Sequence, residues 1–188
     1  RRWLQVQLLQ PMATAEQPQN APLDDLSKIL GSDAHALLDP AVARAWIAFL
    51  TAYGRVTRAL SSELMDASGM SLADFDVMAQ LARAEGYALR MTELADAALI
   101  SKSGLTRRID RLAVNGWVTR RRCTEDGRVH WATLTPLGVK AFRGAAPGHL
   151  RAVAERFGAS LPASEMDRLT RDLIKIATKN KERTREAV

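Results

Sequence analysis

Cysteine, aromatic side chains and long apolar runs are all scarce in this chain of 188 residues. The single cysteine, Cys123, excludes an internal disulfide framework and suits a reducing cytoplasm. No apolar run approaches the ~20 residues that a membrane span requires, so we expect no membrane partner. Aromatic residues make up 5% of the sequence, and their scarcity, together with abundant alanine, favours helices over sheets.

The sequence also lacks the motifs of the common enzyme classes. It contains no GxSxG, no P-loop and no HExxH. Its three histidines, His35, His130 and His149, are scattered without the spacing of a zinc site. We therefore expect no catalytic residues, no cofactor and no metal.

Positive charge is present in excess, and it is concentrated in one stretch. The formal net charge of the chain is +6. Between Lys102 and Arg128, eight basic residues face three acidic ones, whereas residues 13–40 carry five acidic residues and one lysine. A basic working surface of this kind favours an anionic partner such as the DNA backbone.

A long helix is predicted near the start of the ordered chain. Asp39 is a typical N-cap, Pro40 suits the first turn, and Gly69 is a typical C-cap. The apolar face of this helix, about Pro40–Ala67, is broader than a domain of this size needs. A last helix from about Ala163 carries a second apolar stripe and is predicted to end where a charged tail, KNKERTREAV, begins. The stripe consists of Met166, Leu169, Leu173 and Ile176. The two apolar faces predict a homodimer.

Two short helices joined by a tight turn are predicted in the basic stretch. Thr92 is expected to cap a helix over Glu93–Leu99, and Ser101 a second over Lys102–Asn115, which Gly116 closes. This pattern is the outline of a helix-turn-helix.

Two further helices flank this unit. Ser71 and Asp74 resemble a capping box, with aspartate in place of the usual glutamate. Thr135 and Pro136 begin another helix, which is expected to be kinked or interrupted at Pro147.

A basic β-hairpin is predicted directly after the helix-turn-helix. Two β-rich runs, Trp117–Cys123 and Val129–Leu134, flank an Asp-Gly turn, which is a strong hairpin signal. Such a hairpin in this position is a wing. We therefore predict a mainly α (α+β) protein, a winged helix-turn-helix with a two-stranded β-wing and long N- and C-terminal dimerisation helices.

The chain is accordingly divided into four segments. They are an N-terminal leader and flexible arm with a short helix (1–38), a dimerisation helix (39–69), a winged helix-turn-helix DNA-binding domain (70–135), and C-terminal dimerisation helices with a charged tail (136–188). Residues 1–11 are interpreted as a vector-derived or upstream-translated leader, because Met12 would make a natural start.

The second helix of the predicted motif has one apolar face and one polar face. Leu105, Ile109 and Leu112 fall within a narrow arc and must face the core. The polar face and the wing supply the candidate DNA contacts: Ser101, Lys102, Ser103, Thr106, Arg107, Arg111, Arg121, Arg122, Asp126 and Arg128. A merely solvated polar face is the alternative, but the adjoining arginine-rich hairpin favours DNA.

The wing arginines cannot all face one way, because alternate residues of a strand point to opposite sides. Arg121 is expected on one side, and Arg120 and Arg122 on the other. Arg128 is the best candidate to reach a minor groove, although an ion pair with Asp126 is a second interpretation.

The motifs SLADFDVMAQL and MTELADAALISKSGLTRRIDRLAVNGWVTRRRCTEDGRVHWATLTPLG resemble the core of the MarR family over about residues 40–180. The resemblance implies an obligate homodimer with interlocking terminal helices, whose two winged helices read a pseudo-palindromic site in double-stranded DNA. By this match Thr106 and Arg107 contact DNA, and Asp126 and Arg128 form the wing tip. Gly127 departs from the pattern, since many members carry a second arginine there.

The resemblance also suggests a small aromatic or phenolic anion as effector, bound between the dimer helices and the winged domain. The candidate ligand-binding residues are Trp46, Phe49, Tyr53, Phe75, Asp76, Met78 and Arg108. An aromatic stripe at helical spacing is also typical of a core or a dimer seam. A subgroup that responds to urate has an Asp and an Arg aligned with Asp76 and Arg108, but its tryptophan is not evident, so urate is not predicted.

The predicted function is a homodimeric, sequence-specific, cytoplasmic transcriptional regulator, a repressor relieved by such a ligand and associated with the nucleoid when bound. One alternative is an activator that displaces a silencing protein without an effector, and another is a protein-interaction module. A thiol-based redox regulator is a third, although Cys123 lies on a wing strand, not where the peroxide sensors of the family keep their cysteine.

Overall fold

The computed structural model describes residues 38–122 and 129–186. The chain separates into two compact units, Arg1–Tyr53 and Gly54–Val188. The four-segment division of the sequence stays a prediction. In the described ranges, no helix has both the length and the apolar character needed to cross a membrane.

The first described helix, α3, spans Pro40–Ser68 and has the predicted ends. The Asp39 carboxylate caps it by accepting from the Ala41 N–H at 2.7 Å. At the other end Gly69 has a φ of +66°, and its N–H donates to the Met65 carbonyl at 2.8 Å. Glycine adopts this left-handed conformation without strain, so the helix stops there.

Five short elements follow α3 and build the helix-turn-helix. They are α4 (Leu72–Arg83), η1 (Glu85–Tyr87), β1 (Ala88–Arg90), α5 (Met91–Ala97) and α6 (Lys102–Val114). The Ser71 hydroxyl caps α4 by accepting from the Asp74 N–H, and the Ser101 hydroxyl caps α6 by accepting from the Gly104 N–H, both at 3.1 Å. Both predicted N-caps are confirmed.

Helix α5 differs from its prediction at both ends. Its N-cap is Arg90 and not Thr92, because the Glu93 carboxylate accepts from the Arg90 backbone N–H at 3.3 Å and so satisfies the first turn. The helix ends at Ala97, and Leu99, predicted to be its last residue, has a φ of 54°.

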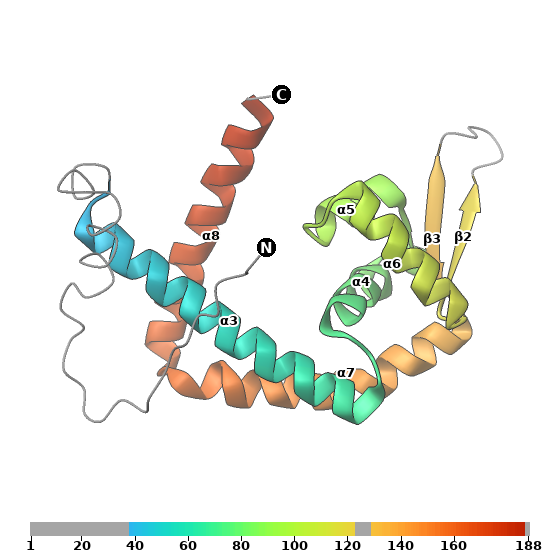
Figure 1. Ribbon diagram of the computed structural model, residues 1–188, viewed down its shortest axis with the longest axis horizontal. Helices are drawn as coiled ribbons and strands as arrows, with labels where there is room; N and C mark the ends of the chain where they lie inside the picture. The colour runs from blue at the N-terminus through green and yellow to red at the C-terminus, as the bar shows by residue number, and fades with distance from the viewer. Residues whose placement is uncertain (1–37, 123–128, 187–188) are drawn as a thin grey trace, which may run out of the picture. The chain divides into compact units, whose positions relative to one another are not determined.

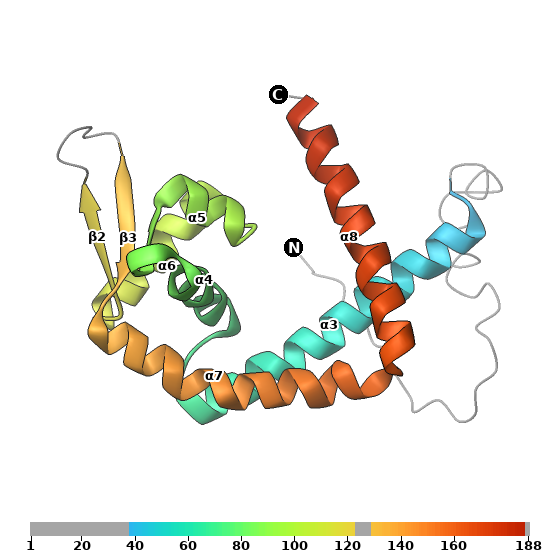
Figure 2. The ribbon, with the colours of Figure 1, turned by 180° about the vertical axis from the view of Figure 1, so that it is seen from behind.

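The wing is part of a three-stranded sheet and not of the predicted two-stranded one. Strands β2 (Val118–Arg122) and β3 (His130–Leu134) are antiparallel, and β1 adds to the other edge of β3, so that the order is β1-β3-β2. Figure 1 and Figure 2 show β2 and β3 side by side next to the helix-turn-helix. The connecting turn, with Cys123, Asp126 and Arg128, lies outside the described residues, so the predictions for these side chains stay predictions.

The chain leaves the sheet through α7 (Pro136–Arg156), followed by η2 (Gly158–Ser160) and α8 (Ala163–Glu186). The Thr135 hydroxyl caps α7 as predicted, accepting from the Gly138 N–H at 2.9 Å. The predicted interruption at Pro147 is absent, since α7 continues through it as one helix. The predicted loss of helix in the charged tail from Lys179 onward is also wrong, because lysine, arginine and glutamate are good helix formers and α8 continues to Glu186.

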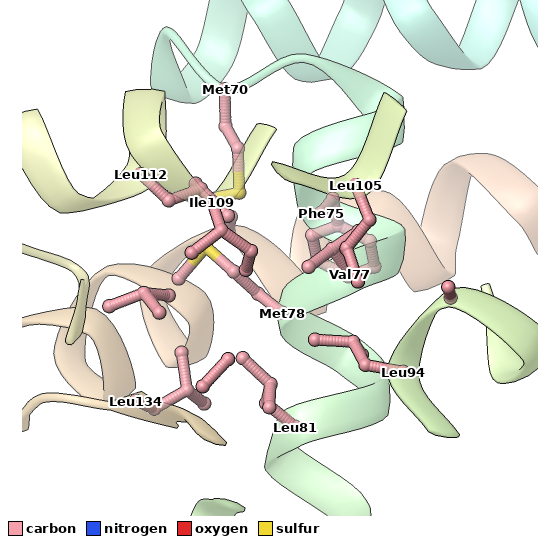
Figure 3. Packing of buried hydrophobic residues seen from close by; sticks show 14 of the residues in the cluster. Met70, Phe75, Val77, Met78, Leu81, Leu94, Leu105, Ile109, Leu112 and Leu134 are labelled. Atoms are coloured by element: carbon pink, nitrogen blue, oxygen red, sulfur yellow. The ribbon is translucent and has the colours of Figure 1, made fainter. Parts of the chain in front are cut away.

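The core fills the space between α4, α5, α6 and the sheet. Leu105, Ile109 and Leu112 are all 0% exposed, which confirms their predicted inward face. Figure 3 shows side chains of α4, α6 and β3 converging on one interior, with Met78 and Ile109 near its centre. Because the apolar face of α6 is held in this way, its opposite face points to solvent.

A close approach of two backbones fixes the exit from the wing. Gly138, in the first turn of α7, is buried, and a Cβ atom there would overlap the Trp117 carbonyl. On the same side the Thr135 hydroxyl donates to the Gly116 carbonyl at 2.7 Å. Only glycine fits where α7 passes so near the start of the wing.

We expect Gly138→Ala to destabilise the protein by roughly 1–3 kcal/mol, because the added methyl must displace backbone. Urea unfolding at fixed protein concentration measures the change. Gly144→Ala is the matched control, since a Cβ there meets open space on the same helix and should leave stability equal or slightly raised. An unfolding midpoint for Gly138→Ala as high as that of the wild-type protein would contradict the close approach.

Candidate nucleic-acid interface and adjoining pocket

The N-terminal end of α6 presents small hydroxyls and an exposed arginine. Ser101 and Ser103 are exposed, with their hydroxyl oxygens 3.3 Å apart, and Ser101 also caps the helix. The Thr106 hydroxyl donates to the Lys102 carbonyl at 3.0 Å, which leaves its lone pairs available as acceptors. Arg107 is exposed on the next turn. These residue types suit phosphates and base edges in a major groove.

A buried carboxylate joins α4 to the flank of α6. One oxygen of Asp74, Oδ1, accepts from Nη1 of Arg108 and from Nη2 of Arg111, each at 2.9 Å. The other oxygen, Oδ2, accepts from the Ser71 hydroxyl at 2.7 Å. Asp74 is 6% exposed and is the one charged residue classed as buried within residues 38–122 and 129–180. Burial alone would raise its pKa, but the hydrogen bonds from Arg111, Ser71 and Arg108 hold the pKa below its ordinary value.

The sequence reasoning missed this ion-pair cluster. The sequence pattern predicts Asp74 as half of a capping box, Arg108 as a ligand contact and Arg111 as a DNA contact. In the structure the Asp74 carboxylate binds the Ser71 hydroxyl and two guanidinium groups of another helix. No local pattern signals this arrangement, since the partners lie 34 and 37 residues apart in sequence.

The wing arginines lie on opposite faces of β2, as predicted. Arg121 is paired with Trp131 and Arg122 with His130 in the register of β2 and β3. Arg90 of β1 pairs with Trp131 from the other side, and its guanidinium carbon lies 5.5 Å from the centre of the indole ring. A cation–π contact of this kind holds the arginine against the sheet. One face of the sheet therefore carries a row of two arginines flanking a tryptophan.

A pocket of about 420 Å³ lies between the C-terminal half of α3 and α7. Its walls include Leu60 and Leu64 of α3 and Ala145, His149 and Ala152 of α7. Its volume lies in the range of small-molecule sites, ~300–1,000 Å³. The His149 ring also packs 4.4 Å from the ring of Phe75.

Two buried nitrogens near this pocket and α6 lack hydrogen-bond partners in the part of the chain that the structure describes. They are Nδ1 of His149 and Nε of Arg108. Burial lowers the pKa of His149, against the opposing effect of Asp76. Desolvation raises the pKa of Asp76, while the charges of His149 and Arg108 oppose that rise. His149 and Arg108 therefore each lie within electrostatic reach of Asp76.

The aromatic residues and the methionine of the predicted ligand site divide between the two units. Trp46, Phe49 and Tyr53 form a stacked row on α3, with successive ring centroids 5.8 and 6.3 Å apart. Phe75 and Met78 are buried in the core of the other unit. Each of these two groups lies together in its own unit, and a single ligand site formed by both groups stays a prediction. Sequence reasoning missed His149, because a lone histidine without ligand spacing carries no signal.

Comparison with known proteins gives consistent matches. The family model described as the MarR family matches residues 68–129. The HTH-type transcriptional repressor YetL of Bacillus subtilis (strain 168) is 34% identical over 86 residues, which are 46% of this chain. The matched region spans 52% of the repressor, about half the length of this curated relative.

Two solved structures from Streptomyces coelicolor are similar over most of both chains. AbsC, a MarR family transcriptional regulator, is 29% identical with a TM-score of 0.72, over 77% of this chain and 97% of AbsC. Sco3205, a MarR family transcriptional regulator solved in complex with DNA, is 31% identical with a TM-score of 0.71. That match covers 76% of this chain and 89% of Sco3205.

The helix-turn-helix is followed by the β2–β3 hairpin, which belongs to a three-stranded sheet, and this arrangement defines a winged helix-turn-helix protein. Because the MarR family regulator Sco3205 is 31% identical and is matched over 89% of its length, the chain belongs to the MarR family, whose members are transcriptional regulators and not enzymes.

We expect Asp74→Asn to lower stability by roughly 1–3 kcal/mol near neutral pH, because two guanidinium groups lose their anionic partner. The folded-state pKa of Asp74 is lowered, so its contribution is present above the ordinary value of 3.8 and is lost as pH falls through the folded pKa. Urea unfolding of both proteins between pH 7 and about pH 3 should show the difference shrinking with acidity.

Asp76→Asn is the matched control on the same helix. The pKa of Asp76 is raised, so its ionised form opposes folding at neutral pH, and the variant should be as stable as wild type or more so. If the stability difference for Asp74→Asn were the same at all pH values, the ion-pair cluster would not carry its effect.

Proposed function

We propose that the protein is a homodimeric, sequence-specific DNA-binding regulator that represses transcription in the cytoplasm and is relieved by a small aromatic anion. The observation that carries the DNA-binding proposal is the orientation of α6. Its apolar stripe is fully enclosed, and its hydroxyl- and arginine-bearing face points outward beside an exposed arginine strand. In this proposal Ser101, Lys102, Ser103, Thr106 and Arg107 meet bases and phosphates of a major groove.

The remaining contacts are assigned to the flank of α6 and to the wing. Arg111, Arg121 and Arg122 meet phosphates, while Arg128, beside Asp126, enters the minor groove. The DNA-bound relative Sco3205 supports the mode of binding, and the similarity to the repressor YetL supports repression. Promoter-reporter activity with and without the gene would separate repression from activation.

Exposed apolar surface supports the homodimer. On α3 the side chains of Trp46, Phe49 and Tyr53 are exposed, as are Leu173 and Ile176 on α8. Exposed apolar side chains gathered on a helix mark an interaction site, and obligate dimers bury roughly 2,000 Å² or more through such surfaces. A dimer would also place two α6 helices about 34 Å apart, one DNA turn, on a pseudo-palindromic site.

We expect Arg107→Ala to weaken binding to a specific duplex by ~1–3 kcal/mol, because a base and phosphate contact is lost. The duplex is one selected by the wild-type protein from a random-sequence library, and fluorescence anisotropy measures affinity and stoichiometry. Arg83→Ala, an equal change of charge at the exposed end of α4, should leave the affinity unchanged. Equal affinity of Arg107→Ala and wild type for specific and scrambled duplexes would refute the placement of the DNA-binding face. Binding of one chain per duplex would refute the dimer.

The pocket between α3 and α7 is the proposed effector site. Its walls are of mixed polarity: the apolar side chains suit an aromatic ring, and His149 and Arg151 are its positively charged or chargeable lining residues. Glu63 and Glu155 also line it, but Glu63 is paired with Arg156 at 2.6 Å. An anion beside His149 would favour the protonated ring, so that ligand affinity should rise as pH falls through the pKa of His149.

We expect salicylate at millimolar concentration to lower the affinity for the selected duplex, and to do so more at pH 6 than at pH 8. His149→Phe should abolish the response, because it keeps the ring packing against Phe75 but removes the nitrogens. His130→Phe on β3 is the matched control and should respond as wild type does. If salicylate loosens wild type and His149→Phe equally, the α3–α7 pocket is not the sensor.

A further inference from the structure

We propose that Asp74 is a positioning residue for DNA recognition: its carboxylate holds the guanidinium of Arg111 at a fixed place on the flank of α6, ready to meet a DNA phosphate. The inference rests on the proposed function and assigns a role in it to a residue outside the binding surface. Asp74 itself belongs to α4 and is buried, so it acts only through its arginine partners.

The side chains of Asp74, Arg108 and Arg111 differ in solvent exposure, and the most exposed of them is a positively charged one. The side chain of Asp74 is 8% exposed, that of Arg108 22% and that of Arg111 55%. Asp74 and Arg108 therefore form the enclosed part of the cluster, and Arg111 extends from it to solvent. A guanidinium has five N–H donors in a rigid fork, so Arg111 can donate to Asp74 and to a phosphate at once.

The position of the carboxylate is set by the cap of α4. The Ser71 hydroxyl accepts from the Asp74 N–H at 3.1 Å and donates to Oδ2 of Asp74 at 2.7 Å. The other oxygen, Oδ1, is shared by Arg108 and Arg111. Every oxygen of the carboxylate is therefore engaged, and the first turn of α4 determines where Arg111 can lie.

A fixed arginine favours specific binding more than non-specific binding. A long, free side chain loses rotamer freedom when it is immobilised at an interface, whereas a held one has lost that freedom already. The negative charge of Asp74 also offsets one positive charge of the two arginines, which weakens the electrostatic attraction to any DNA. Loss of the carboxylate should therefore lower specific affinity and leave non-specific affinity equal or higher. A purely structural role would lower both.

The test is a double-mutant cycle of Asp74→Asn and Arg111→Ala in the full-length protein. Affinities are measured by anisotropy for the selected duplex and for a scrambled duplex, at several salt concentrations. We expect Asp74→Asn to weaken specific binding about three- to tenfold, which corresponds to one ordered side chain. Arg111→Ala should weaken binding to both duplexes and reduce the salt slope by about one unit. In the Arg111→Ala background, Asp74→Asn should have no further effect on specific affinity.

Additive losses in the cycle would overturn the inference, because Asp74 would then act without Arg111. An equal loss of specific and scrambled affinity in Asp74→Asn would overturn it as well. Asp66→Asn, which removes the same charge from an exposed position on α3, is the control and should leave the ratio of the two affinities unchanged. Failure of the wild-type protein to select any duplex would refute the proposed function itself, which keeps the two failures distinct.

A second variant covers the case in which Asp74→Asn does not fold. Arg111→Lys keeps the charge but offers all its donors from one nitrogen, so it cannot bridge Asp74 and a phosphate as a planar fork does. We expect it to keep the salt slope and the scrambled affinity of wild type while losing specific affinity severalfold. Wild-type specific affinity in Arg111→Lys would overturn the positioning role.

Discussion

The enclosure of three side chains on α6 determines where the rest of the candidate interface points. Leu105, Ile109 and Leu112 are wholly inaccessible to solvent, and burying each contributes roughly 1.5–3 kcal/mol. A helix held along one stripe can neither rotate nor slide without exposing it. The direction of Arg107, and of the hydroxyls before it, therefore follows from apolar packing that never touches the partner.

Polar contacts and one close backbone approach then fix the ends of the helices and the path of α7, which the apolar stripe of α6 does not determine. The caps at Ser71, Ser101 and Thr135 fix where three helices begin, and Gly138 fixes how closely α7 passes the start of the wing. The three caps accept hydrogen bonds from nearby backbone N–H groups, and the glycine allows two backbone segments to approach closely. For that reason the sequence was sufficient to predict these caps, and with them the winged helix-turn-helix and the solvent-facing side of α6.

Contacts between distant parts of the chain were beyond prediction from one sequence. The strand Ala88–Arg90 is too short to show a period, and its partner on β3 lies more than forty residues away, so the sheet was predicted with one strand too few. The Asp74 cluster and the packing of His149 on Phe75 are of the same kind. A single sequence is compatible with many pairings of charged and aromatic residues at such separations. Which pairs form is determined by the packing of the folded chain.

One arginine joins the proposed recognition surface to the proposed effector site. Arg108 of α6 binds Asp74 through Nη1, while its charge acts on Asp76, which in turn interacts with His149 in the wall of the pocket. An anion held beside His149, at the proposed effector site, would compete with Asp76 for the positive charge of His149 and Arg108. The anion can weaken DNA binding only if it binds more tightly to an arrangement of Arg108 and α6 that does not fit DNA. The loss of DNA affinity cannot exceed this difference between the anion's affinities for the two arrangements. Because α6 is anchored by a rigid stripe, that preference must act on the whole helix and its wing and not on a single side chain.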